Sequence, residues 1–351
     1  MASSWLDLVG RTPLVELTSL SAATGCRILG KCEFMSVGGS IKDRAAKFII
    51  EAMESSGALQ KGGLLVEATA GNTGIALLLA SKQKGYRCLF TCPDKVSDEK
   101  IQYLRALGAD VVLCPTTVPG TDPNHFINSA IRIAEEKGGV FTNQFDNLAN
   151  MRAHYHTTGP EIWEATGGDL HALVTAAGTG GTVAGCSTFL KEKNSKVQVF
   201  LINPPGAGVV AEPYSEEEAG KHPSRCFLRV KTEAEKEADK SLPSSILEGI
   251  GSGRLYGNLS RAQVDHMFQG TNEAAVSMCN YVLKHEGFFI GGSAGLNVVG
   301  AVLAARRLGP GHTIVTFLCD SGNNYVSKLF RPEWLAANGV TVSSGDGLSF
   351  L

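Results

Sequence analysis

Short apolar runs alternate along the chain with longer stretches whose apolar residues recur at helical spacing. The short runs predict strands at about 26–34, 64–68, 86–92, 110–115, 139–143, 171–177, 196–203, 288–290 and 313–319. The longer stretches predict helices at about 41–55, 74–83, 97–107, 126–137, 182–192 and 293–307. Alternating strands and helices of these lengths indicate an α/β fold with parallel-rich sheets covered by helices.

Glycine-rich segments stand between several of these strands and the helices that follow. Ligands in parallel sheets bind at the carboxyl ends of the strands, which is where such segments lie. Ser40 and Asp43 also predict a capping box at the start of the 41–55 helix, and Gly57 predicts its end.

The composition is that of a globular protein, with 351 residues, 43% hydrophobic and 19% charged. The net charge of −2 provides no basic field, so we expect neither nucleic acid nor a membrane surface as a partner. No apolar run reaches the roughly 18 residues of a membrane span, and no leader signature is present, so a cytoplasmic location is expected. The nine cysteines are scattered without a Cys-x-x-Cys pair, which predicts reduced thiols and no metal site.

Lys42 stands at the start of a predicted helix. It follows the glycine pair at 38–39 and the two residues Ser40 and Ile41. The positive end of a helix and burial both lower the pKa of a lysine, and a neutral amine can form a Schiff base. A solvated lysine on an amphipathic helix fits the same position. The segment alone therefore leaves both interpretations open.

The 69–72 loop, Thr69-Ala70-Gly71-Asn72, joins a predicted strand to a helix. Backbone N–H groups at a helix N-terminus bind anions, and Thr and Asn side chains add hydrogen-bonding groups. The loop therefore suits a substrate carboxylate. A capped turn without a ligand would have the same sequence.

The 178–182 loop consists of Gly178, Thr179, Gly180, Gly181 and Thr182. No Gly-Lys-Ser/Thr follows, which excludes a Walker A loop, and Val183 stands where a dinucleotide fingerprint needs its third glycine. A single phosphate group bound by backbone N–H groups is the predicted ligand, with a tight turn as the alternative. Ser293, in a further glycine-rich segment, is either a helix N-cap or a ligand-binding residue.

Three segments occur together and in a specific order: Ser-Ile-Lys-Asp-Arg at 40–44, Thr-Ala-Gly-Asn-Thr-Gly at 69–74 and Gly-Thr-Gly-Gly-Thr at 178–182. With them the chain strongly resembles the cysteine synthase and cystathionine β-synthase family of fold-type-II pyridoxal-phosphate enzymes. The resemblance runs from Arg11 to about Leu335. It implies a two-lobed fold similar to the tryptophan synthase β-subunit, pyridoxal 5′-phosphate as cofactor, and a homodimer.

The resemblance also implies a role for each motif residue. Lys42 would hold the cofactor as an internal aldimine and then act as general acid and base. Asn72 would hydrogen-bond the 3′-oxygen of the cofactor, and Ser293 would contact its pyridine nitrogen. The cofactor phosphate would be bound by Gly178, Thr179, Gly180, Gly181 and Thr182. The substrate α-carboxylate would be bound by Thr69, Ala70, Gly71 and Gln144.

A hydroxyl at Ser293 does not force the ring nitrogen to stay protonated, so β-elimination to an aminoacrylate is favoured over transamination. The leading prediction is cysteine synthase, in which O-acetylserine or another activated serine reacts with sulfide. Cysteine desulfhydrase and cystathionine β-synthase-like chemistry, with a thiol, use the same aminoacrylate and remain alternatives. A binding protein that has lost catalysis is a further alternative, although Lys42, the 178–182 loop and Ser293 are all present.

The chain departs from the family pattern at several positions. Ala70 stands where the family usually has Ser, which removes one hydroxyl that faces the substrate, and Ala68 stands where Pro is commoner. The segment 248–251 resembles the Glu-Gly-Ile-Gly loop of the family, but Arg254, Leu255 and Tyr256 follow it.

The resemblance implies a smaller, mobile lobe at 49–154. The larger lobe would comprise 1–48 and 155–351 and would carry the 178–182 loop. The smaller lobe would close on the substrate carboxylate. A stretch at about 212–241 is rich in Glu, Lys and Ala and has no counterpart in compact cysteine synthases. It is either a solvated surface excursion or a partner-binding insertion.

Overall fold

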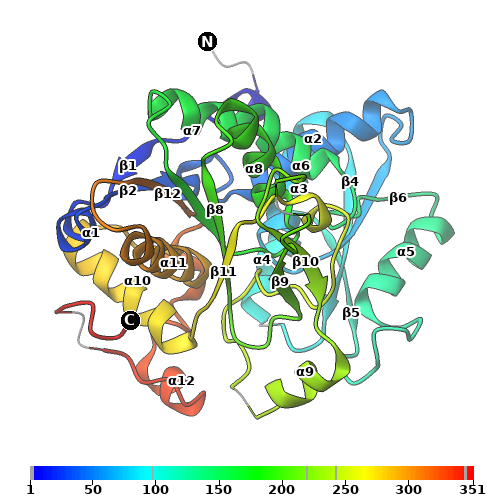
Figure 1. Ribbon diagram of the computed structural model, residues 1–351. Coiled ribbons are helices and arrows are strands. Elements are labelled where there is room, and N and C mark those ends of the chain that lie inside the picture. Colours follow the sequence, from blue (N-terminus) through cyan, green and yellow to red (C-terminus); the bar gives the residue numbers. More distant parts are fainter. Residues whose placement is uncertain (1–3, 97, 219, 242, 344–345) are drawn as a thin grey trace. The chain divides into compact units, whose positions relative to one another are not determined.

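The computed structural model of the chain describes residues 4–96, 98–218, 220–241, 243–343 and 346–351 (Figure 1). Its internal contacts divide the chain into two compact units. Unit 1 comprises the chain up to Gly10 together with Ser36–Ala153. Unit 2 comprises Arg11–Met35 together with His154–Leu351.

Unit 1 is built on a parallel sheet with the strand order β5-β4-β3-β6. Its strands are β3 (Leu64–Ala68), β4 (Arg87–Pro93), β5 (Asp110–Cys114) and β6 (Val140–Phe141). Its helices are η1 (Trp5–Leu8), α2 (Lys42–Ser55), α3 (Asn72–Lys84), α4 (Asp98–Ala106), α5 (Phe126–Glu136) and α6 (Ala149–Ala153). Ser97, the predicted first residue of the 97–107 helix, lies outside the described residues.

Strand β3 is buried along its whole length because helices cover both faces of this sheet. Leu65 joins a hydrophobic cluster with side chains of α2 and α3, whereas Leu64 and Val66 join a cluster with side chains of α5. Successive side chains of a strand point to opposite faces. An uninterrupted apolar run is therefore what a parallel strand between two helical layers requires.

Helix α2 packs against α3 and α6, and these contacts group residues 36–48 with unit 1. The predicted larger lobe includes 1–48, so the two divisions of the chain differ at these residues. The movement of the smaller lobe relative to the larger one stays a prediction.

The predicted capping box at Ser40 and Asp43 is wrong. Helix α2 begins at Lys42, and its N-cap Ile41 makes no side-chain cap hydrogen bond. Ser40 Oγ accepts a hydrogen bond from the Lys42 N–H (3.3 Å), and the Asp43 carboxylate accepts one from the N–H of Gly38 (2.6 Å). Asp43 therefore reaches back to the glycine turn, and its carboxylate stabilises that turn.

Unit 2 contains a sheet with the order β1-β2-β12-β7-β8-β11, in which β1 is antiparallel to β2 and the other pairs are parallel. The strands of this sheet are β1 (Leu14–Glu16), β2 (Arg27–Cys32), β7 (Ala172–Thr175), β8 (Gln198–Asn203), β11 (His266–Gln269) and β12 (Thr313–Leu318). Outside the 212–241 stretch, the α-helices of unit 2 are α1 (Thr18–Thr24), α7 (Gly159–Ala165), α8 (Gly181–Lys193), α10 (Asn272–Glu286), α11 (Gly292–Leu308) and α12 (Pro332–Ala337). The short helices are η2 (Glu33–Met35), the π-helix η3 (His154–Thr158), η4 (Leu259–Arg261) and η5 (Gly322–Tyr325).

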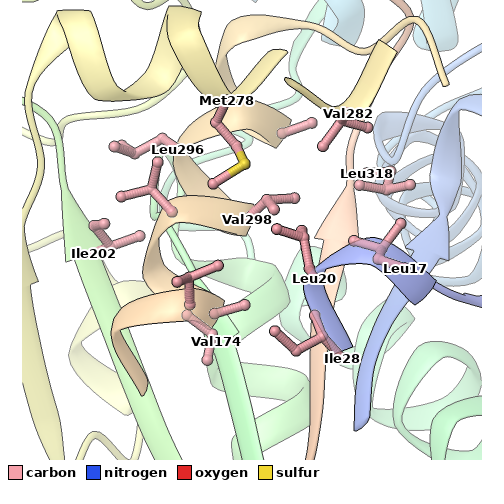
Figure 2. Close-up of a cluster of buried hydrophobic side chains, with 14 of the residues drawn as sticks. Leu17, Leu20, Ile28, Val174, Ile202, Met278, Val282, Leu296, Val298 and Leu318 are labelled. Carbon is pink, nitrogen blue, oxygen red and sulfur yellow. The ribbon is translucent and has the colours of Figure 1, made fainter. Parts of the chain in front are cut away.

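The core of unit 2 forms where α11 packs against this sheet and α10 packs against α11 (Figure 2). Side chains from the strands, such as Val174 and Ile202, meet Leu296 and Val298 of α11. Met278 and Val282 of α10 lie on the other side of the cluster. This packing holds the first turn of α11, with Ser293, on a rigid framework.

The predicted strand 288–290 is wrong. Helix α10 ends at Glu286 and α11 begins at Gly292, so the apolar run between them is a short connection. Its one sheet-like contact is a bridge between Ile290 and Ser321.

The charged stretch 212–241 forms a structure of its own. Strands β9 (Val209–Pro213) and β10 (Cys226–Val230) pair antiparallel, and α9 (Glu233–Asp239) follows. Arg229 forms ion pairs with Glu212 and Glu235, so part of the charge is paired inside the segment. Ala219 lies outside the described residues. The partner-binding interpretation stays untested.

Candidate active site

The 69–72 loop and Gln144 lie at the same edge of the unit 1 sheet. Strands β3 and β6 are parallel neighbours, and the loop follows β3 while Gln144 follows β6. Thr73 Oγ1 donates a hydrogen bond to Gln144 Oε1 (2.6 Å), which joins the start of α3 to the segment after β6. The structure therefore brings together Thr69–Gly71 and Gln144, the residues predicted to bind a carboxylate.

Local hydrogen bonds shape the 69–72 loop for an anion. The Thr69 N–H donates to Thr91 O (3.0 Å), and the Gly71 N–H lies 3.2 Å from Thr69 Oγ1. Gly71 is the N-cap of α3, and Asn72 is its first residue. Apart from Gly71 and the adjoining backbone, no atom of the described residues lies within 4 Å of the position that a Cβ at Gly71 would take. The N-terminal end of a long helix next to open space is suited to an anionic group.

Glu67 is a buried carboxylate at the base of this loop. Its side chain is 0% exposed, and it accepts hydrogen bonds from the N–H groups of Ala68 (2.8 Å) and Gln144 (3.0 Å) and from the hydroxyl of Thr142. Burial raises the pKa of Glu67 to about 7, although these hydrogen bonds act in the opposite direction. The carboxylate thus titrates near neutral pH.

Lys42 is the first residue of α2, as predicted, and is partly buried. The helix behind it is rigid, because Ala45, Ile49 and neighbouring residues belong to the hydrophobic cluster of unit 1. A lysine Nζ on such a support can be placed accurately for reaction with a carbonyl carbon.

The 178–182 loop of unit 2 follows β7 and starts α8, with Gly180 as the N-cap. Gly180 has a φ of +85°, and a Cβ at this residue would lie 2.4 Å from the Cα of Leu259. A Cβ at Gly178 would lie 2.1 Å from the carbonyl oxygen of Gly249. Both positions therefore require glycine. The Gly251 N–H also donates to Ala177 O (2.9 Å), so the 248–251 segment lies against this loop.

Two hydroxyls of this loop are held by neighbours in unit 2. Thr179 is buried, and its Oγ1 lies 3.4 Å from the Gly181 nitrogen. Thr182 Oγ1 lies 3.2 Å from Nε2 of the buried His154. The other ring nitrogen of His154 lies 2.9 Å from Thr158 Oγ1. The loop therefore combines helix N–H groups with oriented hydroxyls, a combination suited to a phosphate.

Ser293 lies in the first turn of α11 and is 9% exposed, but Gly291 is the N-cap. The N-cap alternative for Ser293 is therefore wrong. One turn further, Asn297 accepts a hydrogen bond from the Ala176 N–H (2.6 Å) and donates one to Phe317 O (2.9 Å). This amide ties α11 to the ends of β7 and β12. Ser293 and the 178–182 loop therefore share one support.

Within the described residues, no group of three His, Cys, Asp or Glu side chains is arranged to hold a metal ion. None of the helices in the same part of the chain is long and apolar enough to cross a bilayer. No disulfide joins any of the nine cysteines, all of which are described.

The model of a protein family described as pyridoxal-phosphate dependent enzyme matches residues 6–320 of this chain. The chain belongs to this family. Pyridoxal phosphate is therefore the cofactor of this enzyme. The residues present fit it, because Lys42 supplies a primary amine and Ser293 a hydroxyl, while the 178–182 loop supplies the N-terminal end of α8 and two threonine hydroxyls.

Comparison with similar proteins shows to which group of pyridoxal-phosphate enzymes the chain belongs. A cysteine synthase from Dictyostelium discoideum is 46% identical over 99% of this chain and 89% of that protein. Cysteine synthase 1 from Neurospora crassa is 44% identical over 95% of this chain and 85% of that protein. A cystathionine beta-synthase from Oryctolagus cuniculus is 37% identical over 95% of this chain, which spans 57% of that protein. The enzyme is therefore a member of the cysteine synthase family.

The fold is also shared with a solved structure. The crystal structure of O-acetylserine dependent cystathionine beta-synthase from Helicobacter pylori has a TM-score of 0.78 to this chain at 28% identity. The match covers 93% of this chain and 98% of that one. The predicted α/β fold of a fold-type-II pyridoxal-phosphate enzyme is confirmed.

Three buried polar side chains next to the predicted site residues received no role from sequence reasoning: Glu67, His154 and Asn297. For two of them the sequence contains a feature that indicates a buried, hydrogen-bonded side chain. Glu67 is a charged residue inside an apolar strand, and Asn297 is an amide inside an apolar helix, and such residues are buried only with hydrogen-bonding partners. His154 lies in a segment of mixed polarity, and nothing in its surroundings in the sequence distinguishes it.

Proposed function

We propose that this enzyme forms cysteine by β-replacement, from O-acetylserine or another activated serine and sulfide. The observation that carries the proposal is the assembly of Thr69–Gly71 with Gln144 at one sheet edge, in a chain 46% identical to a cysteine synthase. In this reaction the Cβ–O bond to acetate breaks and a Cβ–S bond to sulfide forms.

The proposed roles follow the chemistry that each group can perform. Pyridoxal phosphate, when bound, withdraws electrons from Cα of the amino acid, which makes loss of the β-substituent feasible. Lys42 Nζ removes the Cα proton and returns it when the product forms. Thr69–Gly71 and Gln144 bind the α-carboxylate and so orient the Cα–H bond toward that nitrogen.

The remaining residues hold the cofactor in our proposal. Gly178–Thr182 bind its phosphate through backbone N–H groups and hydroxyls. Asn72 donates to its 3′-oxygen, and Ser293 interacts with its ring nitrogen without imposing a charge. Lys42 and Asn72 belong to unit 1, and the other residues belong to unit 2.

A second candidate is cystathionine β-synthase-like replacement, in which a thiol takes the place of sulfide. It is favoured by the 37% identity to a cystathionine beta-synthase and by the structural match to an O-acetylserine dependent enzyme of that name. Desulfhydration of cysteine is a further variant, because it breaks the same Cβ–S bond.

A sulfide assay separates these activities. The purified enzyme is incubated with O-acetylserine and sulfide, with O-acetylserine and homocysteine, and with cysteine alone. Consumption of sulfide with formation of cysteine is the expected result. Release of sulfide from cysteine, or preferential use of homocysteine, would contradict the leading proposal and support its alternative.

Replacement of Lys42 tests the mechanism. We expect Lys42→Ala to lower kcat by about 10³-fold or more, because proton transfer at Cα and attachment of the cofactor are both lost. The matched control is Lys47→Ala, on the same helix, where the side chain donates to Leu6 O (3.0 Å). Equal activity of the two variants would contradict the role of Lys42.

We also propose that the enzyme is a cytoplasmic homodimer. The absence of disulfides among its nine cysteines suits a reducing compartment, and the family resemblance supports a dimer. Light scattering of the purified protein should give twice the chain mass of 37.0 kDa.

A further inference from the structure

Glu67 is a buried ionisable residue that has no role in the proposed mechanism. It is the fourth residue of β3 and directly precedes Ala68 and the 69–72 loop. Water does not reach it, since its exposed fraction is 0%. A carboxylate is stable in such a place only with hydrogen-bond donors on its oxygens.

The donors to Glu67 come from two segments of unit 1. Oε1 accepts from the Ala68 N–H (2.8 Å), at the base of the 69–72 loop. Oε2 accepts from the Gln144 N–H (3.0 Å) and from the Thr142 hydroxyl, both in the segment after β6. One side chain therefore joins the two segments that carry the proposed carboxylate ligands.

The other hydrogen bonds of Gln144 complete its support. Its carbonyl oxygen accepts from Asn150 Nδ2 (2.9 Å), and its side-chain Oε1 accepts from Thr73 Oγ1 (2.6 Å). The preceding residue, Asn143, has a φ of +50°, a left-handed conformation that is unusual outside glycine. Such a backbone persists when bonds on both sides hold it, as those of Thr142 and Gln144 to Glu67 do.

We propose that Glu67 is a positioning residue that holds Gln144 in register with Thr69–Gly71 and thereby sets the affinity of the enzyme for the α-carboxylate of its substrate. This inference rests on the proposed function, because it takes Thr69–Gly71 and Gln144 as the carboxylate ligands. Glu67 acts through those ligands and does not itself touch the substrate.

Ala68 adds a feature specific to this chain. Its N–H donates a hydrogen bond to Glu67, and a proline at this position, which is commoner in the family, has no N–H to donate. Here both carboxylate oxygens are bound, so the side chain has little freedom to rotate away from Gln144.

The test compares four variants of the holoenzyme with the wild type. Glu67→Gln keeps the shape of the side chain but replaces one carboxylate oxygen by an NH₂ group. This NH₂ group then faces the N–H of Ala68 or of Gln144, and because both groups are donors, that hydrogen bond is lost. Thr142→Val removes one donor, and Thr142→Ser restores it. Glu54→Gln is the matched control, since Glu54 also lies in unit 1 and accepts from Lys84 and Tyr86, in a different part of that unit.

Affinity is read from the visible band of the bound cofactor during titration with L-serine, L-cysteine and L-alanine, and from KM for O-acetylserine. We expect Glu67→Gln and Thr142→Val to raise these constants tenfold or more. KM for sulfide, the dissociation constant of the cofactor and the values for Thr142→Ser and Glu54→Gln should stay within threefold of wild type.

A melting temperature that falls without a change in amino-acid affinity would overturn the proposal, because Glu67 would then only stabilise the fold. An equal loss of amino-acid and cofactor affinity would overturn it as well. Failure of the proposed function would give a different result. The wild-type enzyme would then make no cysteine from O-acetylserine and sulfide, but its affinity for amino acids could still be measured from the cofactor band.

Discussion

The 69–72 loop and the 178–182 loop are both glycine-containing turns from a parallel strand into a helix, yet their glycines serve different purposes. At Gly180 a Cβ would lie 2.4 Å from Leu259, whereas a Cβ at Gly71 would have no described atom within 4 Å apart from its own residue and the adjoining backbone. Gly180 also needs a φ of +85°, whereas Gly71 has a φ of −115°. Gly180 is therefore required by the packing and backbone conformation of the protein, whereas Gly71 leaves open space beside the 69–72 loop.

The side chains that support the two loops differ as well. Glu67 supports the 69–72 loop with a carboxylate that accepts hydrogen bonds from Ala68, Thr142 and Gln144. Asn297 supports the strand that leads to the 178–182 loop with an amide that both accepts and donates. A carboxylate titrates and an amide does not. The carboxylate that supports the first loop should therefore respond to pH near neutrality, whereas the amide that supports the second loop should not.

The largest effect is expected at Gly180. Gly180→Ala should lower the free energy of unfolding by about 3 kcal/mol, because the new Cβ forces both a backbone clash and an unfavourable φ. Urea unfolding measures this loss. Gly206→Ala is the control, since Gly206 has a φ of +73° but open space around it, and should cost about 1 kcal/mol. Equal losses at the two positions would show that the close approach to Leu259 is unimportant.

The carboxylate support should make stability depend on pH. Folding raises the pKa of Glu67 from 4.5 to about 7, so the folded protein holds this proton more tightly than the unfolded chain. The free energy of unfolding should therefore fall as pH rises from about 4.5 to about 7, by up to about 3 kcal/mol from this group. Urea unfolding across this range should show a flatter profile for Glu67→Gln. Parallel profiles of wild type and variant would contradict the raised pKa.

The hydroxyls of the 178–182 loop should matter for the cofactor alone. The double variant Thr179→Ala, Thr182→Ala should bind pyridoxal phosphate about tenfold more weakly, which corresponds to about 1.4 kcal/mol. Titration of the apoprotein measures this constant. Thr166→Ala, whose hydroxyl donates to Ile162 O within unit 2, should leave it unchanged. An unchanged constant in the double variant would argue against the phosphate assignment.

The smallest effect on stability is expected at Gly71. Gly71→Ala should change the free energy of unfolding by no more than about 0.5 kcal/mol, because its φ is negative and the space is open. KM for O-acetylserine should rise at least fivefold, since the methyl group occupies space beside the proposed carboxylate ligands. A destabilisation as large as that of Gly180→Ala would remove the distinction between the two loops.

Most of the α/β pattern could be predicted from the sequence because it depends on local periodicity. Buried strands such as β3 are apolar runs, and α2 was predicted to within a residue at its start. The capping box at Ser40 and Asp43 failed because Asp43 bonds to Gly38 instead. The 288–290 strand failed because an apolar connection between two helices has the same local pattern as a short strand.

The family and its cofactor could be inferred from the sequence, because the motifs at 40–44, 69–74 and 178–182 resemble those of known pyridoxal-phosphate enzymes. The roles of the motif residues stay predictions. Tertiary structure decided which of those residues meet and what supports them. Gln144 follows the 69–72 loop by more than seventy positions, and only the parallel pairing of β3 with β6 places it beside Thr73. The roles of Glu67 and Asn297 likewise depend on hydrogen bonds between segments distant in the chain, which local sequence patterns do not encode.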